Sequence, residues 1–600
     1  MMYSLNKTIL IVLFFIFKIT VGQEAGLSYK IHSHNDYEQK VPFWTAYACG
    51  LNSIEVDVFL KKDTLFVTHS EEEIVPFNTI ENLYLKPLQE TIALNPESNQ
   101  HVQLLIDIKS EAISTLKILM NVLEAYPDLI NSKNISFVIS GNQPKPEAYN
   151  NYPFYLKFDY QSLESLSLES IKKVGLISLP FSKFSKWNGK GRLTKEDYNK
   201  VSQIIIKAHS FNKPFRFWGC PDSKTAWKAF AELGVDFINT DDPFDASKYI
   251  NSLPDRISKN SFYSEVYKPT YHSDKKNSQV KNIILMIGDG YGLSQISAAA
   301  FSNHENLSLT QLKSIGFLKT QSSDDFTTDS AAAGTAIATG EKTYNRFIGM
   351  DENRRPIENI TELLSKHEYN TGFITTDNVT GATPAAFYSH QLDRDMTKEI
   401  ANDLSKSKLS LFMGGGSSNV SEVFYNSNFK LVNNLDEVRL SKSNKIGFFF
   451  SEQGVPSINS GRGNILPEAT KAGIVYLSKQ NNPFFLMIEG AQIDSFGHRN
   501  DISGIVTEAI DFDKAITEAI KYADAHENTL VIITADHETS GLSIPQGSTK
   551  DNKVEGDFST YDHTGVMVPI FAYGPKSDVF SGVYDNNEVF HKIIEVLNLK

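Results

Sequence analysis

The 600-residue sequence contains only two cysteines, no dense run of basic residues and a single long apolar segment. Cys49 and Cys220 are too few for a disulfide framework; they either pair in an oxidising compartment or stay as buried free thiols. The net charge of −13, without a basic cluster, argues against nucleic acid or an acidic membrane as a partner. We therefore expect no nucleic-acid partner.

The long apolar segment lies near the amino terminus. Lys7 precedes the nine apolar residues Ile9–Phe17, and the small residues around Gly22 offer a cleavage site. Nine apolar residues are too few to span a bilayer, so the pattern predicts a signal peptide over 1–22. An uncleaved anchor and a buried first strand are the alternatives. The prediction implies an exported protein, periplasmic or secreted, and no later segment is typical of a transmembrane helix.

The rest of the chain divides into two halves. A length of 600 residues suits two or three domains. Over 27–250, short apolar runs alternate with helical patterns, which favours a parallel sheet or barrel. The polar residues 251–280 lack apolar periodicity and are predicted to form a linker, and a second βα series follows over 281–600. Besides a first strand near His32, the strands expected in the first half are Ser53–Leu60, Leu65–Thr68, Gln103–Ile108, Ile135–Ile139, Gly175–Leu179, Phe215–Trp218 and Asp236–Asn239.

In the second half, three apolar runs end in potential metal ligands. A single Asp after a strand is usually a turn residue or a helix cap. Several acids at the carboxyl ends of strands in an open α/β sheet predict a shared polar site. The runs and their ligands are Ile283–Ile287 with Asp289, Phe484–Ile488 with Glu489, and Leu530–Thr534 with Asp536 and His537.

Asp494 and His498 are four residues apart, so in a helix both side chains would lie on one face. Carboxylate and imidazole donors suit Zn²⁺ in a tetrahedral site. For this pair alone, an ion pair on the surface is the alternative. Together with Asp536 and His537, the pair favours a metal site.

Six motifs of the second half resemble those of alkaline phosphatases, in the order that the family has them. The resemblance covers about 281–600 and implies a three-layer αβα domain, hydrolysis of small phosphate monoesters and a homodimer. The motifs are MIGDGYG (286–292), TDSAAAGTAIATG (328–340), ATPA (382–385), EGAQIDSFGH (489–498), TADH (534–537) and DHTG (562–565).

The same resemblance implies a role for each matching residue. Ser330 would be the nucleophile that becomes phosphorylated, and Arg394 would bind the phosphate. Metal coordination activates a serine hydroxyl, and a guanidinium binds two phosphate oxygens at once. The implied ligands are Asp494, His498 and His563 for one zinc, Asp289, Asp536 and His537 for the other, and Asp289, Thr383 and Glu489 for a magnesium.

Two features near the nucleophile refine this expectation. Ala331–Ala333 and Gly334 leave room for a phosphoryl group, and a helix that starts at Ser330 would present free N–H groups to it. A closely packed helix without a ligand is the alternative. Gly381 stands where members of the family usually carry His or Asp near the magnesium, so the magnesium site is expected to differ here.

The first half carries a second group of acids and histidines. HSHNDY (32–37) ends the first expected strand, and IEVDVFLKKDTLFVTHS (54–70) contains Glu55, Asp57 and His69. Glu55 and Asp57 are two apart, so in a strand they share one face, as do Asp107 and Lys109. Such residues at the ends of barrel strands are typical of catalysis, and a solvated polar strand face is the alternative.

This pattern resembles the glycerophosphodiester phosphodiesterase and phosphatidylinositol-phospholipase-C-like barrels over about 29–242. The resemblance implies a TIM-like (β/α) barrel that cleaves phosphodiesters, with His32 in a structural role. Asn35 in place of Arg, and Asp107 in place of Glu, depart from the phosphodiesterase pattern, so glycerol specificity does not carry over. The implied roles are Glu55, Asp57 and Asp107 on one Ca²⁺ or Mg²⁺, His34 and His69 as acid and base, and Lys109 on the phosphate.

Three hypotheses follow. The chain is a bifunctional exported hydrolase whose barrel makes the monoester that the phosphatase cleaves. Alternatively, an inactive barrel serves as a binding module beside an active phosphatase. In the third hypothesis, Ser330 hydrolyses sulfate esters or phosphodiesters. Arg394 and the magnesium ligands favour monoesters, because they add positive charge for a dianion.

Overall fold

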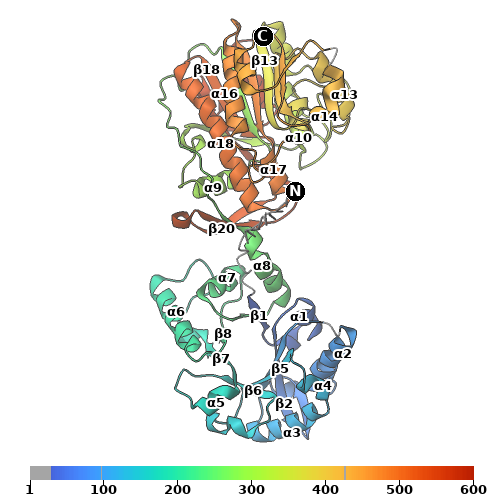
Figure 1. Ribbon diagram of the computed structural model, residues 1–600, viewed down its shortest axis with the longest axis vertical. Coiled ribbons are helices and arrows are strands. Elements are labelled where there is room, and N and C mark those ends of the chain that lie inside the picture. Colours follow the sequence, from blue (N-terminus) through green and yellow to red (C-terminus); the bar gives the residue numbers. More distant parts are fainter. Residues whose placement is uncertain (1–28, 96–97, 425–426, 600) are drawn as a thin grey trace, which may run out of the picture. The chain divides into compact units, whose positions relative to one another are not determined.

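The computed structural model describes residues 29–95, 98–424 and 427–599, which form two compact units that divide between Pro254 and Asp255 (Figure 1). The predicted signal peptide over 1–22 lies outside the described residues. Among the residues that are described, no helix is long and apolar enough to cross a membrane. Cys49 and Cys220 are free thiols, so the alternative in which they pair is wrong for this structure.

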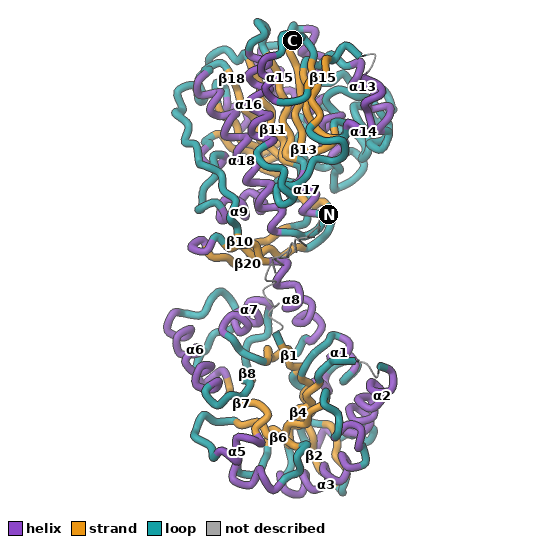
Figure 2. The backbone as a smooth tube through the Cα atoms, viewed as in Figure 1, coloured by secondary structure: helices purple, strands orange, loops and turns teal. Residues whose placement is uncertain are grey.

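The first unit is a barrel (Figure 2). Eight parallel strands close it, because β1 pairs with β9 on one side and with β2 on the other, while β3 adds an antiparallel hairpin to β2. The strands are β1 (Lys30–Ser33), β2 (Ser53–Lys61), β3 (Thr64–Val67), β4 (Val102–Ile108), β5 (Ile135–Gly141), β6 (Leu156–Tyr160), β7 (Val174–Pro180), β8 (Phe215–Trp218) and β9 (Phe237–Thr240). The helices are α1 (Trp44–Ala48), α2 (Lys86–Leu94), α3 (Ala112–Glu124), α4 (Pro127–Ile130), α5 (Leu168–Lys173), α6 (Lys195–His209), α7 (Lys224–Leu233) and α8 (Pro243–Arg256).

The predicted barrel is confirmed, and one strand was missed. β6 reads LKFDY, an alternation of apolar and charged residues that lacks the apolar run of its neighbours. Its Asp159 is fully buried, where the hydroxyls of Ser140 and Ser178 donate to one carboxylate oxygen. Asp159, which interrupts the apolar pattern of this strand in the sequence, therefore belongs to the polar interior of the barrel.

The second unit is a three-layer αβα domain, as expected. Figure 1 shows α16 and α18 on one side of a ten-stranded sheet and α13 and α14 on the other. Its central strands are buried on both faces, which explains their continuous apolar runs. In spatial order the strands are β15 (Lys430–Val432), β16 (Ile446–Phe449), β14 (Leu411–Gly415), β13 (Asn370–Asn378), β17 (Phe484–Gly490), β11 (Asn282–Gly288), β18 (Thr529–Ala535), β23 (Val568–Tyr573), β12 (Ser314–Lys319) and β24 (Gly582–Asp585).

The remaining elements cover or extend this sheet. Two small antiparallel sheets join β10 (Ile257–Lys259), β21 (Lys553–Phe558) and β20 (Leu542–Ser548), and β19 (Glu538–Thr539) with β22 (His563–Thr564). The helices are α9 (Leu293–Ser302), α10 (Ser330–Thr339), α11 (Ile360–Lys366), α12 (Ala382–Ala385), α13 (Thr397–Lys406), α14 (Ser417–Phe424), α15 (Leu435–Leu440), α16 (Ile465–Ser478), α17 (Gln492–Gly497), α18 (Ile502–Ala525) and α19 (Glu588–Leu597).

The predicted linker over 251–280 needs correction. Its first residues complete α8, and β10 pairs with β21 of the second unit. Further on, Tyr267 Oη and the backbone N–H of Thr270 donate to Asp524 Oδ2 of α18 at 2.7 and 2.9 Å. Hydrogen bonds to one distant acid hold this segment in place. A segment held by polar contacts needs no periodic apolar residues, so the sequence pattern does not reveal it.

Replacing Asp524 with alanine should lower the free energy of unfolding of the second unit by about 2 kcal/mol, because several donors lose a charged acceptor. Chemical denaturation of the full chain measures the change. Glu527→Ala, which removes an exposed acid three residues later, is the matched control. Equal stability of both variants would show that Asp524 does not hold the segment.

Candidate active sites

The acids of the second unit gather at one edge of its sheet. β13, β17, β11 and β18 are neighbouring parallel strands, and their register places Ile287 beside both Glu489 and Thr534. Asp289 and Asp536 therefore follow adjacent strands, each two residues beyond the level of Glu489. As predicted for an open α/β sheet, the carboxyl ends of the strands deliver these side chains to one place.

Three histidines turn the same nitrogen toward this place. His537 Nε2 lies 3.5 Å from Asp289 Oδ1 and 3.3 Å from Asp536 Oδ2. His498 Nε2 lies 3.3 Å from Asp494 Oδ2 and 3.1 Å from His563 Nε2. The sequence-predicted ligands of the two zinc ions are thus brought together in two adjacent groups.

In two of these histidines, the other ring nitrogen, Nδ1, donates a hydrogen bond to a backbone carbonyl. His498 Nδ1 donates to the carbonyl of Tyr561 at 2.6 Å, and His563 Nδ1 donates to that of Thr328 at 2.8 Å. In a neutral ring, donation from Nδ1 leaves Nε2 unprotonated, and this is the form that binds metal. The facing Nε2 atoms of His498 and His563 therefore fit a shared cation better than they fit each other.

The acids also fit metal ions. Asp289 Oδ1, Asp536 Oδ2 and Thr383 Oγ1 are buried and, in the described structure, have no hydrogen-bond partner. Burial and the nearby Asp536 charge raise the pKa of Asp289 well above its ordinary value, and burial raises the pKa of Asp536 to about 6. A cation would offset the repulsion among these buried acids and would give their unpaired oxygens a partner.

Ser330 begins α10 beside these groups. Its Oγ lies 3.3 Å from His537 Nε2, and the serine is 3% exposed. Asp329 caps the helix by accepting from the N–H of Ala332 at 2.9 Å, and its other oxygen accepts from Arg394 Nη1 at 3.1 Å. Asp329 therefore positions both the helix and the guanidinium, a role that sequence analysis missed although an Asp before a helix is a capping signal.

The small residues after Ser330 serve helix packing as well as access. A Cβ on Gly334 would lie 3.2 Å from Ala386 Cβ and 3.5 Å from Thr383 Cα. α10 therefore packs directly against α12, the short helix that carries Thr383. The close approach of the two helices brings Ser330 and Thr383 to the same region. The small residues of α10 therefore serve close helix packing, which was the alternative interpretation, as well as access to Ser330.

The barrel holds a second group of acids. Ligand oxygens of Glu55, Asp57 and Asp107 lie close enough to hold one cation, and Asp57 Oδ1 and Asp107 Oδ1 are buried without partners in the described structure. Gly141, with φ of 68°, makes room for them, because a Cβ there would lie 1.9 Å from Asp107 Oδ1. These three acids and this glycine fit a hard cation with oxygen ligands.

The other oxygen of Asp57 joins the predicted phosphate and proton-transfer groups. Asp57 Oδ2 lies 3.1 Å from Lys109 Nζ and 2.8 Å from His69 Nδ1, and it accepts from Tyr37 Oη at 2.9 Å. His34 lies across the cleft, with Nε2 3.9 Å from Glu55 Oε1. All six predicted barrel residues therefore border one site.

Sequence analysis missed two residues of the barrel site. Arg216 of β8 is buried and donates to Glu55 Oε2 at 2.7 Å, and it also contacts His32. Burial and the Arg216 charge lower the pKa of His32 to about 3, so this ring is neutral, in keeping with the expected structural role. Asp241 lies 2.7 Å from His34 Nδ1 and orients that ring.

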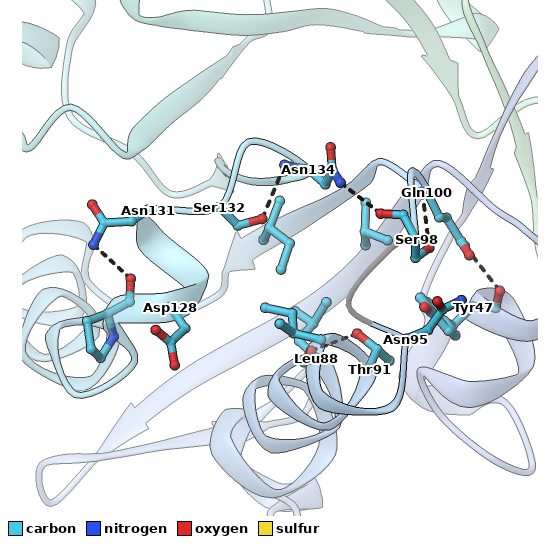
Figure 3. Close-up of a pocket in the computed structure, with 14 residues that line it drawn as sticks. Tyr47, Leu88, Thr91, Asn95, Ser98, Gln100, Asp128, Asn131, Ser132 and Asn134 are labelled. Atoms are coloured by element: carbon cyan, nitrogen blue, oxygen red, sulfur yellow. Dashed lines mark hydrogen bonds between the residues drawn. The ribbon is translucent and has the colours of Figure 1, made fainter.

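A cleft of about 550 Å³ opens above these barrel residues and is bordered by His34, Lys109 and the exposed Trp218. Figure 3 shows a different cavity of about 370 Å³, near the amino-terminal ends of β4 and β5. Amides, hydroxyls and apolar side chains line it, with Asp128 as its acid. The catalytic groups of TIM barrels lie at the carboxyl ends of the strands, so of these two cavities the one beside His34 and Lys109 fits a reaction site.

Comparison with known families identifies the second unit. The model named alkaline phosphatase matches 280–428, 416–553 and 546–599, more than half of the chain. The chain belongs to the alkaline phosphatase family. It is therefore an enzyme that hydrolyses phosphate monoesters.

Relatives of this family cover the second half of the chain. Alkaline phosphatase 3 of Bacillus subtilis is 30% identical over 419 residues, 54% of this chain and 90% of its own length. The solved alkaline phosphatase of the Antarctic bacterium TAB5 is 39% identical and covers 54% of this chain and 99% of its own, with a TM-score of 0.51. A solved variant of the TAB5 enzyme, with one His replaced by Asp, has Mg bound. It is 38% identical to this chain, covers 54% of this chain and 100% of its own, and has a TM-score of 0.52.

Phosphodiesterase families match parts of the barrel. An AIM6-like phosphodiesterase domain matches 24–102, which includes His34, Glu55, Asp57 and His69. The glycerophosphoryl diester phosphodiesterase family matches 214–243, which includes Arg216 and Asp241. The chain is thus an alkaline phosphatase fused to a phosphodiesterase-like barrel.

Arg216→Met should lower the free energy of unfolding of the barrel by about 3 kcal/mol, because it leaves Glu55 buried and unpaired. Adding Glu55→Gln should restore part of that loss, since the buried charge is then absent. Chemical denaturation of the single and double variants measures the coupling. Additive effects of the two substitutions would contradict a direct pairing.

Proposed function

We propose that this alkaline phosphatase is exported, holds two zinc ions and one magnesium ion, and forms a phosphoserine at Ser330. We further propose that its barrel cleaves phosphodiesters to monoesters, which the phosphatase unit then hydrolyses. The convergence of Asp289, Asp536 and His537 on Ser330 carries the first part of the proposal. The apolar pattern within 1–22 supports export.

The proposed zinc ligands are Asp494, His498 and His563 in one group and Asp289, Asp536 and His537 in the other. Asp289, Thr383 and Glu489 are the proposed magnesium ligands. Two bound zinc ions would stabilise the entering and leaving oxygens of an in-line displacement.

Residues of the chain supply the remaining steps. Ser330 Oγ, after losing its proton to solvent, attacks phosphorus. The P–O bond to the alcohol breaks on the opposite side, where water protonates the departing oxygen. Arg394, held by Asp329, offers its fork of donors to the phosphoryl oxygens. The N–H groups at the start of α10 that Asp329 does not accept would also stabilise the same anion. Water then attacks the phosphoserine from the side that the alcohol left.

The barrel provides a complete set of groups for phosphodiester cleavage. Asp241 orients His34, and Asp57 orients His69, so two imidazoles are fixed for proton transfer. Lys109 offsets phosphate charge, and Glu55, Asp57 and Asp107 would hold a Ca²⁺ or Mg²⁺. Covalent fusion keeps the monoester product at a raised local concentration near the phosphatase.

Ser330→Ala should reduce monoesterase turnover by a factor of about 1,000 or more, because the covalent nucleophile is lost. Steady-state hydrolysis of a small aryl phosphate measures it, with equal zinc content as the check on folding. The control is Ser297→Ala, whose hydroxyl bonds only to its own helix at Leu293. Turnover within tenfold of wild type would move the chemistry away from Ser330.

The Ser330→Ala protein also isolates the barrel reaction. Incubated with a panel of phosphodiesters, including glycerophosphodiesters, and with Ca²⁺, Mg²⁺ or Zn²⁺ in turn, it should accumulate monoesters that phosphorus NMR detects. Adding Asp57→Asn should stop accumulation, because the cation and His69 lose their shared acid. Asp63→Asn, an exposed acid in the hairpin after β2, should not.

If monoester still accumulates after Asp57→Asn is added, the acids of the barrel site do not carry out the phosphodiester cleavage. No product with any of the three metals, beside an active wild-type phosphatase, would favour a barrel that binds phosphodiesters without cleaving them.

A further inference from the structure

Asp377 lies at the end of β13, with one carboxylate oxygen over Gly381. A Cβ built on Gly381 would lie 2.2 Å from Asp377 Oδ2 and 2.9 Å from its Cγ. The other oxygen, Oδ1, accepts from the backbone N–H of Asn378 at 2.7 Å. The carboxylate is therefore held on one side by the turn, and its free oxygen fills the space that a side chain at position 381 would occupy.

The surroundings of this oxygen belong to the proposed magnesium site. Gly381 is the N-cap of α12, which carries Thr383. The N–H of Asp377 donates to Thr375 Oγ1 at 2.8 Å, and that hydroxyl donates to Glu489. A short chain of hydrogen bonds thus links Asp377 to one proposed ligand, and the adjoining helix turn links it to another.

The charges in this region are also coupled. Burial and then the Asp377 carboxylate raise the pKa of Glu489 to about 8. Burial raises the pKa of Asp377, and the Arg394 guanidinium opposes that rise. Asp377 therefore acts electrostatically on a proposed metal ligand and on the proposed phosphate-binding arginine.

We propose that Asp377 supplies the carboxylate that position 381 lacks and determines how tightly the site of Asp289, Thr383 and Glu489 retains Mg²⁺. Mg²⁺ keeps several waters in protein sites, and carboxylates outside its direct ligands accept hydrogen bonds from them. The overlap at 2.2 Å means that a side chain at position 381 and the Asp377 carboxylate in its present position would compete for one space. Glycine at position 381 then leaves the space that the Asp377 carboxylate occupies. The inference rests on the proposed magnesium site.

Asp377→Asn separates this role from a structural one. The amide oxygen can still accept from the N–H of Asn378, so the turn is kept while the charge is removed. In protein stripped of metal and reloaded with Zn²⁺, calorimetric titration with Mg²⁺ should show affinity weakened about 10- to 100-fold. Bound zinc and the melting temperature before Mg²⁺ is added should equal those of wild type. Glu399→Gln, at an exposed acid of α13, is the matched control.

Moving the acid provides a second test. Gly381→Asp alone should lower the melting temperature without tightening Mg²⁺ binding, because two carboxylates would compete for one space. Asp377→Ala combined with Gly381→Asp should recover most of the Mg²⁺ affinity that Asp377→Ala loses. Recovery in the double variant would support the exchange of positions, and a further loss would overturn it.

The outcomes separate this inference from the proposed function. Wild-type Mg²⁺ affinity in Asp377→Asn, with binding weakened by Thr383→Val, would overturn the role of Asp377 and leave the site intact. An Asp377→Asn protein that melts lower before Mg²⁺ is added would indicate a structural acid and overturn it as well. No Mg²⁺ uptake by wild type would overturn the proposed site itself.

Discussion

Repulsion among buried carboxylates is the constraint on which the phosphatase unit depends. Asp289, Glu489 and Asp536 sit at the ends of three neighbouring strands, and burial raises the pKa of each. The apolar strands behind them create this arrangement, since parallel pairing of β17, β11 and β18 brings their carboxyl ends to the same edge of the sheet. In the proposed function, bound cations would offset this repulsion and would also activate Ser330, so one electrostatic requirement would serve both structure and catalysis.

The barrel meets a similar constraint with different means. Its acids also gather at the carboxyl edge of parallel strands, but Arg216 and Lys109 lie among them. The Arg216 guanidinium opposes the effect of burial and holds the pKa of Glu55 well below its ordinary value. Part of the charge is therefore balanced within the protein. One oxygen each of Asp57 and Asp107 remains for a cation.

Local signals explain which features the sequence predicts. An apolar run followed by an acid indicates both a buried strand and the side chain at its end, so Asp289, Asp536 and His537 could be found. Arg216 could not, because one basic residue in the short strand FRFW becomes an interior group only when the barrel closes. Asp377 gives no signal either, since its role depends on a glycine four residues later that departs from the family pattern. The segment predicted as a linker, 251–280, contains the end of α8, strand β10 and residues that bond to distant polar partners, none of which gives an apolar pattern in the sequence.

The proposed function places two zinc ions beside Ser330 at the carboxyl edge of the sheet. Anomalous diffraction at the zinc edge, from crystals of the full chain grown with Zn²⁺, tests it directly. The account predicts two zinc peaks, one about 2 Å from ligand atoms of Asp289, Asp536 and His537, the other equally close to Asp494, His498 and His563. A well-ordered site without a zinc peak, or with zinc only at other residues, would contradict it.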